Sequence, residues 1–359
     1  MAETFADKLS KNLLNLRYAF RPGKPLLTLR LAAAVLKSWI LGRPPLRYVD
    51  FAIDFACNLR CDHCFAQALI DPARTRMTPQ DYRAVARQAM AMGAVNFSFQ
   101  GGEPLLCSEL PEIIKACSPH KNLISVTTNG TLLTQDRLEQ LKALGVDILT
   151  VSLDSSIAAE HDSFRGVPGS YERTVAGVDR ALAAGFRVSL GTVVTHASLR
   201  GPGLAGLIKF ARDRGLLLYL ILPVPAGKWM AASSMMLTQE DEGYVDELTR
   251  ESPFIRIDFQ ANLGGYGCGA AKEILYLTPY GDVLPCPFMH ISFGNARTEL
   301  LAEIRAKMLA NRYLDHYHGK CLVSTDAQFI KEHLSRTFTA GRLPMPAEQA
   351  FAPQSQGEH

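Results

Sequence analysis

Three cysteines, Cys57, Cys61 and Cys64, stand in a C-x3-C-x2-C spacing on an expected loop, directly after a run of residues that predicts a β-strand. Three thiolates held this closely can bind three corners of a cubane iron–sulfur cluster, which leaves the fourth iron for a small molecule to chelate. The alternatives are a zinc knuckle or simply buried thiols, and a knuckle needs a fourth Cys or His nearby. His63 lies between two of the thiols, so its simultaneous coordination would be strained. We therefore interpret the triplet as a cluster-binding loop.

A second set of three cysteines, Cys268, Cys286 and Cys321, lies in the last third of the chain. Alternating apolar residues around a Pro-Tyr-Gly-Asp turn at 279–282 predict a β-hairpin. Such a hairpin brings Cys268 and Cys286 back towards each other, and Cys321 follows on a later segment. Folded together, the three thiols would hold a second cluster; isolated core thiols and a zinc site are the alternatives.

From residue 46 onwards, short apolar runs alternate with amphipathic helical windows, which predicts repeated strand–helix units and a parallel sheet. We expect strands at 48–55, 95–100, 123–127, 148–153, 187–195 and 216–222, and helices at 79–92, 109–117, 135–144, 170–184 and 203–214. Six such units form an α/β fold, an open partial (β/α)6 TIM-like barrel, whose ligand site lies at the carboxyl ends of the strands. The expected parts are an N-terminal helical segment (1–47), the barrel (48–225), a small C-terminal auxiliary iron–sulfur domain (226–335) and a loosely ordered polar tail (336–359).

Polar motifs follow the expected strands. Gly101 and Gly102 come after the second strand, where glycines let the backbone approach a ligand closely and leave N–H and C=O groups free to bond it. Glu103 follows, and its carboxylate would suit an ammonium group. Asn129 and Ser152 stand at the ends of the third and fourth strands, where short polar side chains can bond a ribose or a carboxylate. Each motif alone is generic, so the prediction of one site depends on their shared position.

Together with the glycine motif, the triplet, with the His63 ring just before its third cysteine, resembles the signature of the radical S-adenosylmethionine (SAM) superfamily. Its enzymes chelate SAM on the open iron of a [4Fe-4S] cluster and cleave it reductively to a 5′-deoxyadenosyl radical. The resemblance implies that the first three cysteines ligate this cluster and that His63 belongs to the cofactor site. It also implies the SAM contacts of Gly101, Gly102, Glu103 and Ser152, of which the first three match the family's Gly-Gly-Glu motif.

The same resemblance assigns roles to two further residues, Asn129 and Arg165. Asn129 faces the cavity in which some relatives bind substrate. Arg165 lies in the segment 161–166, which looks like the family's His-Asp-x-x-Arg-Gly loop. The resemblance places Arg165 near the SAM carboxylate or the substrate, and the alternative is a solvated structural arginine.

The second cysteine set resembles the auxiliary-cluster region of the SPASM and Twitch branches of this superfamily. The step from Gly281 to Cys286 fits the branch's Gly-x4-Cys pattern, but no further cysteine follows closely, and Ser324 stands where a terminal Cys-x2-Cys would place its second thiol. The resemblance therefore implies one auxiliary [4Fe-4S] cluster with three thiolate ligands. Its fourth iron is either open to substrate or held by a residue among His290, His316, His318, Ser324 and Asp326.

These features predict a radical SAM oxidoreductase or maturase that uses SAM and abstracts hydrogen from its substrate. We expect a small-molecule oxidation or rearrangement in a biosynthetic pathway, because Twitch-type relatives act on small molecules and residues 1–47 do not resemble a leader-peptide-binding domain. A ribosomal-peptide maturase, which forms a cross-link, thioether or epimer, is the alternative. An iron–sulfur electron-transfer protein without SAM chemistry is the remote one. A reduced flavodoxin or ferredoxin is the expected electron donor.

The net charge, the cysteine content and the lengths of the apolar runs limit which partners and which compartment we expect. The net charge of +3 is too small to argue for nucleic acid. Eight cysteines without a signal peptide or a short disulfide scaffold predict a cytoplasmic protein, in which Cys107 and Cys117 are ordinary thiols. No apolar run is long enough for a transmembrane segment. The segment 26–41 predicts an amphipathic helix packed on the domain, with an interfacial membrane helix as the alternative.

Overall fold

One curved sheet of nine strands forms the centre of the molecule, in the order β7-β6-β5-β4-β3-β2-β1-β8-β9. The computed structural model describes residues 21–41, 46–230, 233–257 and 267–353. All neighbours in the sheet are parallel except the β8–β9 hairpin. The strands are β1 (Tyr48–Asp54), β2 (Asn96–Gly101), β3 (Leu123–Thr128), β4 (Ile148–Ser152), β5 (Arg187–Val193), β6 (Leu217–Ile221), β7 (Ile255–Ile257), β8 (Ile274–Leu277) and β9 (Val283–Leu284), with β10 (Ile291–Ser292) and β11 (Met345–Pro346) in a separate pair. The prediction of a partial α/β barrel is confirmed.

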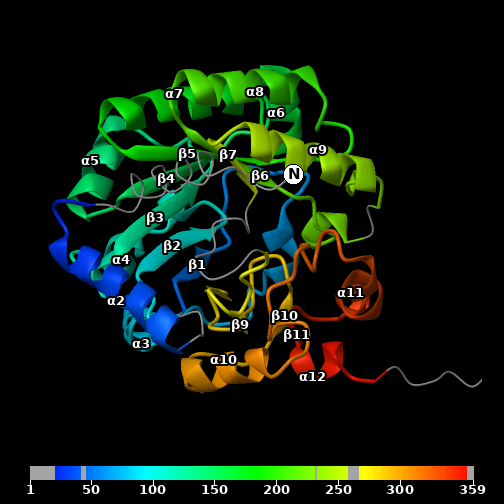
Figure 1. The fold of residues 1–359 in the computed structure, drawn as a ribbon. Coiled ribbons are helices and arrows are strands. Elements are labelled where there is room, and N and C mark those ends of the chain that lie inside the picture. The colour runs from blue at the N-terminus through cyan, green and yellow to red at the C-terminus, as the bar shows by residue number, and fades with distance from the viewer. Residues whose placement is uncertain (1–20, 42–45, 231–232, 258–266, 354–359) are drawn as a thin grey trace, which may run out of the picture.

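Helices cover the outer face of the sheet, as Figure 1 shows. The helices of the described residues, in chain order, are α2 (Pro25–Leu41), α3 (Pro79–Ala91), α4 (Leu110–Ala116), α5 (Gln135–Ala143), α6 (Ala158–Arg165), α7 (Ser170–Ala183), α8 (Pro202–Asp213), α9 (Gln239–Glu251), α10 (Leu301–Leu309), α11 (Ala327–Glu332) and α12 (Ala347–Ala350). Of these, α11 and α12 lie in the C-terminal region rather than on the outer face of the barrel. Short 3₁₀ turns are η1 (Phe65–Leu69), η2 (Pro104–Leu106), η3 (Gly227–Trp229), η4 (Ser233–Met235) and η5 (Leu334–Thr339). Helix α3 begins with a capping box between Thr78 and Asp81.

The two faces of the sheet differ in polarity. On the helix side, Phe51 packs edge-on against Tyr82 of α3, with ring centroids 5.1 Å apart, and stacks on Phe97 of β2. Because side chains alternate along a strand, Asp50 and Ser98, which are register partners, point to the opposite, concave face. The Thr150 and Ser189 hydroxyls lie 3.0 Å apart across β4 and β5. The interior of the barrel is therefore lined by polar side chains.

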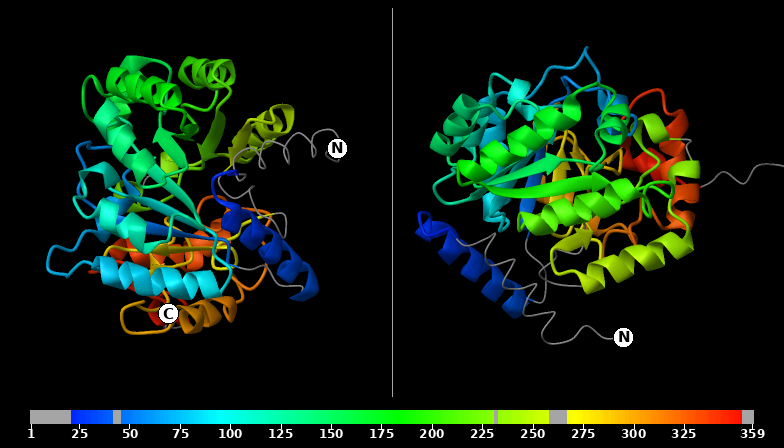
Figure 2. Two further views of the ribbon diagram at one scale, coloured as in Figure 1. Left: turned by 90° about the vertical axis from the view of Figure 1, so that its left-hand side faces the viewer. Right: turned by 90° about the horizontal axis from the view of Figure 1, so that it is seen from above.

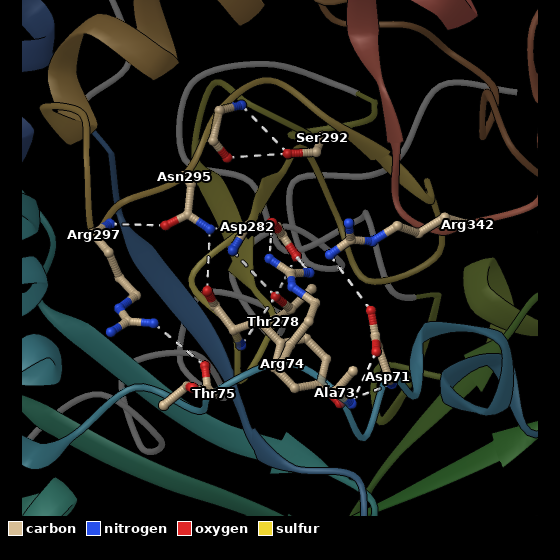
Figure 3. Close-up of polar contacts among 12 residues, drawn as sticks. Asp71, Ala73, Arg74, Thr75, Thr278, Asp282, Ser292, Asn295, Arg297 and Arg342 are labelled. Carbon is tan, nitrogen blue, oxygen red and sulfur yellow. Dashed lines mark hydrogen bonds and ion pairs between the residues drawn. The ribbon is translucent and has the colours of Figure 1, made fainter.

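The C-terminal region continues this sheet, because β8 pairs directly with β1 and the predicted hairpin is present. In Figure 1 the yellow-to-red part of the chain packs beside β1. Figure 3 shows how the hairpin turn is held: Arg74, from the segment after η1, forms a bidentate ion pair with Asp282, at 2.8 Å for Nη2. Thr278 donates to the same carboxylate at 2.9 Å. The segment that follows the first cysteine loop is thus joined to the β8–β9 hairpin of the C-terminal region by a partly buried polar network.

Two boundaries differ from the expected organisation. Strand β7 and helix α9 add a further parallel unit beyond residue 225. The segment after 335 was expected to be a loose tail, but residues 336–353 pack on the domain. Met345 pairs with Ile291, and Leu343 and Ala350 are buried. These few apolar side chains among polar neighbours anchor the segment, which composition alone does not reveal.

Candidate functional site

The loop that carries Cys57, Cys61 and Cys64 connects β1 to η1 at the carboxyl edge of the sheet. Cys57 is exposed and the other two thiols are half-buried. Two N–H groups point at these sulfurs: the Leu59 backbone N–H lies 3.4 Å from Cys57 Sγ, and Arg165 Nη1 lies 3.7 Å from Cys61 Sγ. Donors of this kind stabilise thiolate character on the sulfur atoms.

The donor set fits an iron–sulfur cluster. Burial raises the pKa of Cys57 and Cys64, and the neighbouring Cys61 adds repulsion, so thiolates here need a cationic centre among them. Within the described ranges, no three His, Cys, Asp or Glu side chains converge closely enough to share one metal ion. Three thiolates on one loop match three corners of a cubane cluster, which spreads its ligands over the width of the cluster.

Two other segments hold this loop in place. The backbone N–H groups of Arg60 and Asp62 donate to the Arg165 and Phe164 carbonyls, both at 3.0 Å, at the end of α6. On the other side, Lys228 Nζ donates to the Cys61 carbonyl at 2.9 Å. Gly227 lies so close that a Cβ there would be 2.1 Å from the Cys64 carbonyl oxygen. The loop conformation is thus set by backbone contacts on both flanks.

The glycines of the predicted SAM motif act differently from the expectation. Their N–H and C=O groups were expected to be free for a ligand, but the Gly102 N–H donates to the Asp54 carbonyl at 2.8 Å, and the neighbouring Glu103 N–H donates to the Ala56 carbonyl at the same distance. A Cβ at Gly101 or Gly102 would lie 2.2 Å from a backbone oxygen of the cluster loop. Glycine is required here because two backbones touch, and these contacts join the end of β2 to the start of the cluster loop.

Glu103 is buried behind these glycines, with a side chain that is 1% exposed. Its carboxylate accepts hydrogen bonds from Thr128 Oγ1 and the Asn129 N–H, both at 2.8 Å, and from the Leu105 N–H at 3.1 Å. Burial raises the pKa of Glu103, although these bonds oppose the shift. A cationic ligand next to this buried carboxylate would restore its ionised form.

Asn129 belongs to a polar chain that reaches the cluster loop. Its Nδ2 donates to Asn58 Oδ1 at 2.8 Å, and Asn58 Nδ2 in turn donates to Thr131 Oγ1 at 2.9 Å. Ser152 ends β4 opposite Gly191 of β5 and stays partly exposed at the same edge of the sheet. Both predicted residues therefore lie on the expected side of the barrel.

Arg165 is held by a carboxylate that the sequence analysis did not single out. Arg165 Nε donates to Asp154 Oδ2 at 2.6 Å, and the Val193 N–H donates to Asp154 Oδ1 at 3.2 Å. Burial alone would raise the pKa of Asp154, but the Arg165 guanidinium outweighs it and holds that pKa below its usual value. Arg165 is 7% exposed, so the alternative of a solvated arginine is excluded. Its second contact, to Cys61, makes it part of the cluster loop's surroundings.

His63 and His161 are aromatic neighbours of this pair. The His63 ring stacks on Phe164, with centroids 4.4 Å apart, and lies 5.9 Å from the Trp229 ring. Burial, with Arg165 nearby, lowers the pKa of His63 to about 3, and burial lowers that of His161 to about 4. Both rings are neutral at physiological pH. His63 Nδ1 is buried without a hydrogen-bond partner, as expected of an atom that faces a ligand site.

The second cysteine set also comes together. All three thiols are half-buried, and burial, together with the thiols of Cys268 and Cys286, raises the pKa of Cys321. The Cys268 N–H donates to the His318 carbonyl at 2.8 Å. This bond places the Cys268 backbone beside the segment that leads to Cys321.

Several proposed fourth ligands of this set are engaged elsewhere. Ser324 Oγ donates to the Pro223 carbonyl at 2.7 Å, and Asp326 caps α11 through the Phe329 N–H. His318 Nε2 lies 2.8 Å from the Tyr313 carbonyl. His290 is 1% exposed, and its Nε2 has no hydrogen-bond partner.

Sequence reasoning missed Asp154, Asn58 and Lys228. Asp154 follows the end of β4, and this position is the signal that could have marked it. Asn58 lies inside the cysteine triplet. Lys228 gives no signal in the sequence, because its role depends on a loop that folds back over the cluster loop.

Comparison with known families matches residues 55–203 to the radical SAM superfamily and residues 268–323 to SPASM, an iron-sulfur cluster-binding domain. The AdoMet-dependent heme synthase of Oleidesulfovibrio alaskensis is 26% identical over 313 residues, which cover 78% of this chain and 80% of that protein. The PqqA peptide cyclase of Xanthomonas campestris is 27% identical over 286 residues, 73% of each chain.

Solved structures share the fold. Streptococcus suis SuiB bound to precursor peptide SuiA superposes with a TM-score of 0.59 at 18% identity, over 76% of this chain and 68% of that one. Native anSMEcpe with bound AdoMet gives a TM-score of 0.57 at 16% identity, over 78% and 84%. The cysteine loop, the barrel and these matches lead to one conclusion: the chain belongs to the radical SAM superfamily and carries a SPASM-type auxiliary cluster domain, so it is an enzyme that uses a [4Fe-4S] cluster, SAM and an auxiliary iron–sulfur cluster.

Proposed function

We propose that Cys57, Cys61 and Cys64 hold the SAM-binding cluster and that the substrate is a small polar molecule bound inside the barrel. When bound, this cluster supplies the electron that cleaves SAM to methionine and the 5′-deoxyadenosyl radical. The observation that carries the substrate class is the polar concave face of the sheet, where Asp50, Ser98, Thr150 and Ser189 lie below the cluster loop. Buried polar side chains of this kind recognise polar groups of a ligand.

The surrounding residues would bind and orient SAM. Glu103 offers a buried carboxylate to the ammonium group of SAM, beside the Gly101–Gly102 backbone and near Ser152. Arg165 is held by its ion pair with Asp154 and donates to Cys61 Sγ. Its guanidinium would bind the carboxylate group of SAM. The apolar rings of His63, Phe164 and Trp229 exclude water at this edge of the site.

Cys268, Cys286 and Cys321 would hold the auxiliary cluster with three thiolates. Ser324 stands where a fourth thiol would be expected, and its hydroxyl is engaged with Pro223. We infer that these three residues would leave the cluster one corner without a protein thiolate, and that the cluster would supply a binding position for substrate or an acceptor for one electron. Two relatives support a small-molecule substrate: the AdoMet-dependent heme synthase of Oleidesulfovibrio alaskensis and the Fe-coproporphyrin III synthase of Methanosarcina barkeri.

A peptide substrate is the second candidate. The observations that favour it are the match to a PqqA peptide cyclase over 73% of each chain and the shared fold with SuiB in complex with a peptide.

The test separates substrate classes by deuterium transfer. Extract from the source organism, grown on deuterated medium, is divided by ultrafiltration into small-molecule and peptide fractions. Each is added anaerobically to reconstituted holoenzyme with SAM and dithionite, and mass spectrometry measures deuterium in 5′-deoxyadenosine. We expect deuterium with the small-molecule fraction, because hydrogen abstraction moves the label onto the radical.

Label from the peptide fraction alone would establish the peptide alternative. The control is the Cys57→Ala, Cys61→Ala, Cys64→Ala variant, which we expect to form no labelled product with either fraction. If wild type forms no 5′-deoxyadenosine with either fraction, the proposed hydrogen abstraction from a substrate of these fractions is wrong.

A further inference from the structure

Helix α2 carries a stripe of apolar side chains that the described residues leave exposed. Leu26, Leu29, Leu36 and Ile40 are 49%, 66%, 58% and 72% exposed, and from Leu29 onwards they recur on one side of the helix. Leu27, on the side that faces the domain, is 1% exposed. Figure 2 shows α2 on the outside of the barrel, at the edge of the molecule. Both sides of this helix are therefore apolar, and only one is packed on the protein.

The helix lies against the end of the barrel away from the cluster loop. Arg30 donates to the Ala94 carbonyl at 2.7 Å, just before β2, and also to Asn122, just before β3. Lys24 donates to the Gly145 carbonyl at 2.9 Å and pairs with Asp147, just before β4. These are the amino ends of parallel strands, whereas the cluster loop follows the carboxyl end of β1.

The sequence around α2 is strongly basic. Residues 8–49 contain nine Lys and Arg and no Asp or Glu. The rest of the chain holds the other 29 of the 38 basic residues and all 35 acidic ones, so it is net negative although the whole chain is +3. The positive charge is therefore concentrated in the segment that exposes the apolar stripe.

We propose that α2 docks this enzyme on an anionic lipid bilayer surface. The apolar stripe would enter the boundary between headgroups and acyl chains, and the net positive charge of residues 8–49 would attract anionic headgroups. A second copy of this chain fits less well, because pairing two stripes would bring two basic segments together without an acidic partner. No described helix is long and apolar enough to cross a membrane, so the contact is peripheral.

Docking in this orientation leaves the active side free. The bilayer would lie at the amino ends of β2, β3 and β4, and the mouth of the barrel would face the water, open to an electron donor. The proposal does not depend on the identity of the substrate, and the substitutions that test it lie far from the cysteine loop.

The test is cosedimentation of the full-length, cluster-loaded protein with vesicles of phosphatidylcholine alone or with about one third phosphatidylglycerol. We expect binding to the anionic vesicles, weakened by salt because headgroup contacts are screened. The double variant Leu29→Glu, Leu36→Glu removes apolar contact and adds negative charge, so its partition coefficient should fall at least about tenfold. The matched control is Leu300→Glu, which replaces a leucine of 56% exposure outside α2 and should bind as wild type does.

Iron content and 5′-deoxyadenosine formation serve as folding checks, and both should be unchanged in the three proteins. Three results would each overturn the proposal. The first is that wild type stays in the supernatant with anionic vesicles at low salt, and the second is that the double variant binds as well as wild type. The third is a wild-type dimer in light scattering that the double variant converts to monomer without any vesicle binding, which would assign the stripe to a second copy.

Discussion

Replacing Cys57, Cys61 and Cys64 together by alanine is expected to lower the iron content of the reconstituted protein from about eight to about four per chain, as for two cubanes of which one loses its ligands. The three thiols lie on one loop, and without them the described residues around the loop offer no other set of thiols. Anaerobic iron and sulfide analysis makes the measurement. The remaining cluster should give an electron paramagnetic resonance spectrum that SAM does not alter.

The matched variant Cys268→Ala, Cys286→Ala, Cys321→Ala should also keep about four irons, but its spectrum should respond to SAM. Cys107→Ala with Cys117→Ala should leave about eight, because both thiols are buried and belong to neither set. If the first triple variant retained no iron while wild type held about four, the protein would contain one cluster and the auxiliary assignment would be wrong.

Asp154→Ala is expected to destabilise the protein by about 3–5 kcal/mol, because it leaves the guanidinium of Arg165 buried and unpaired. The pair is nearly inaccessible to water, with side chains 8% and 6% exposed, so solvent screens it little. Urea unfolding of the anaerobic holoprotein, followed by circular dichroism, measures the change. The loop should loosen as well, since Arg165 also contacts Cys61.

The control is Asp213→Ala, which removes the exposed partner of Lys209 and should leave the unfolding midpoint unchanged. The pH dependence has a defined sign. The folded-state pKa of Asp154 is depressed, so its contribution is complete above the unfolded value of about 3.9 and is lost as pH falls through the folded pKa. An Asp154→Ala variant as stable as wild type at neutral pH would contradict this role.

The main features of the barrel follow from the sequence because hydrophobic patterning reports which face of an element is buried. All six predicted strands exist, and the hairpin was marked by its turn residues. The helices α6 and α9 were missed, although α9 begins with a capping box at Thr238. Patterning does not report which strand lies beside which, so the pairing of β8 with β1 appears only in the structure.

The sequence predicted which residues belong to the site better than it predicted the contacts that these residues make. The cysteine spacing marks the cluster loop because ligand chemistry restricts it. The roles of Gly101 and Gly102 could not be predicted, because a close approach between two backbones depends on tertiary position. Asp154 was missed for the same reason: its partner Arg165 is eleven residues away, and only the turn between β4 and α6 brings them together.

Reductive cleavage of SAM depends on the cluster that the cysteine loop would hold. The amount of 5′-deoxyadenosine that dithionite-reduced protein forms from SAM under anaerobic conditions measures this cleavage directly. Wild type and the Cys107→Ala, Cys117→Ala variant should both form it. The Cys57→Ala, Cys61→Ala, Cys64→Ala variant should fall to the level of the buffer, because no open iron remains to bind SAM. If the triple variant still cleaved SAM, or if fully loaded wild type did not, Cys57, Cys61 and Cys64 would not hold the cluster that cleaves SAM.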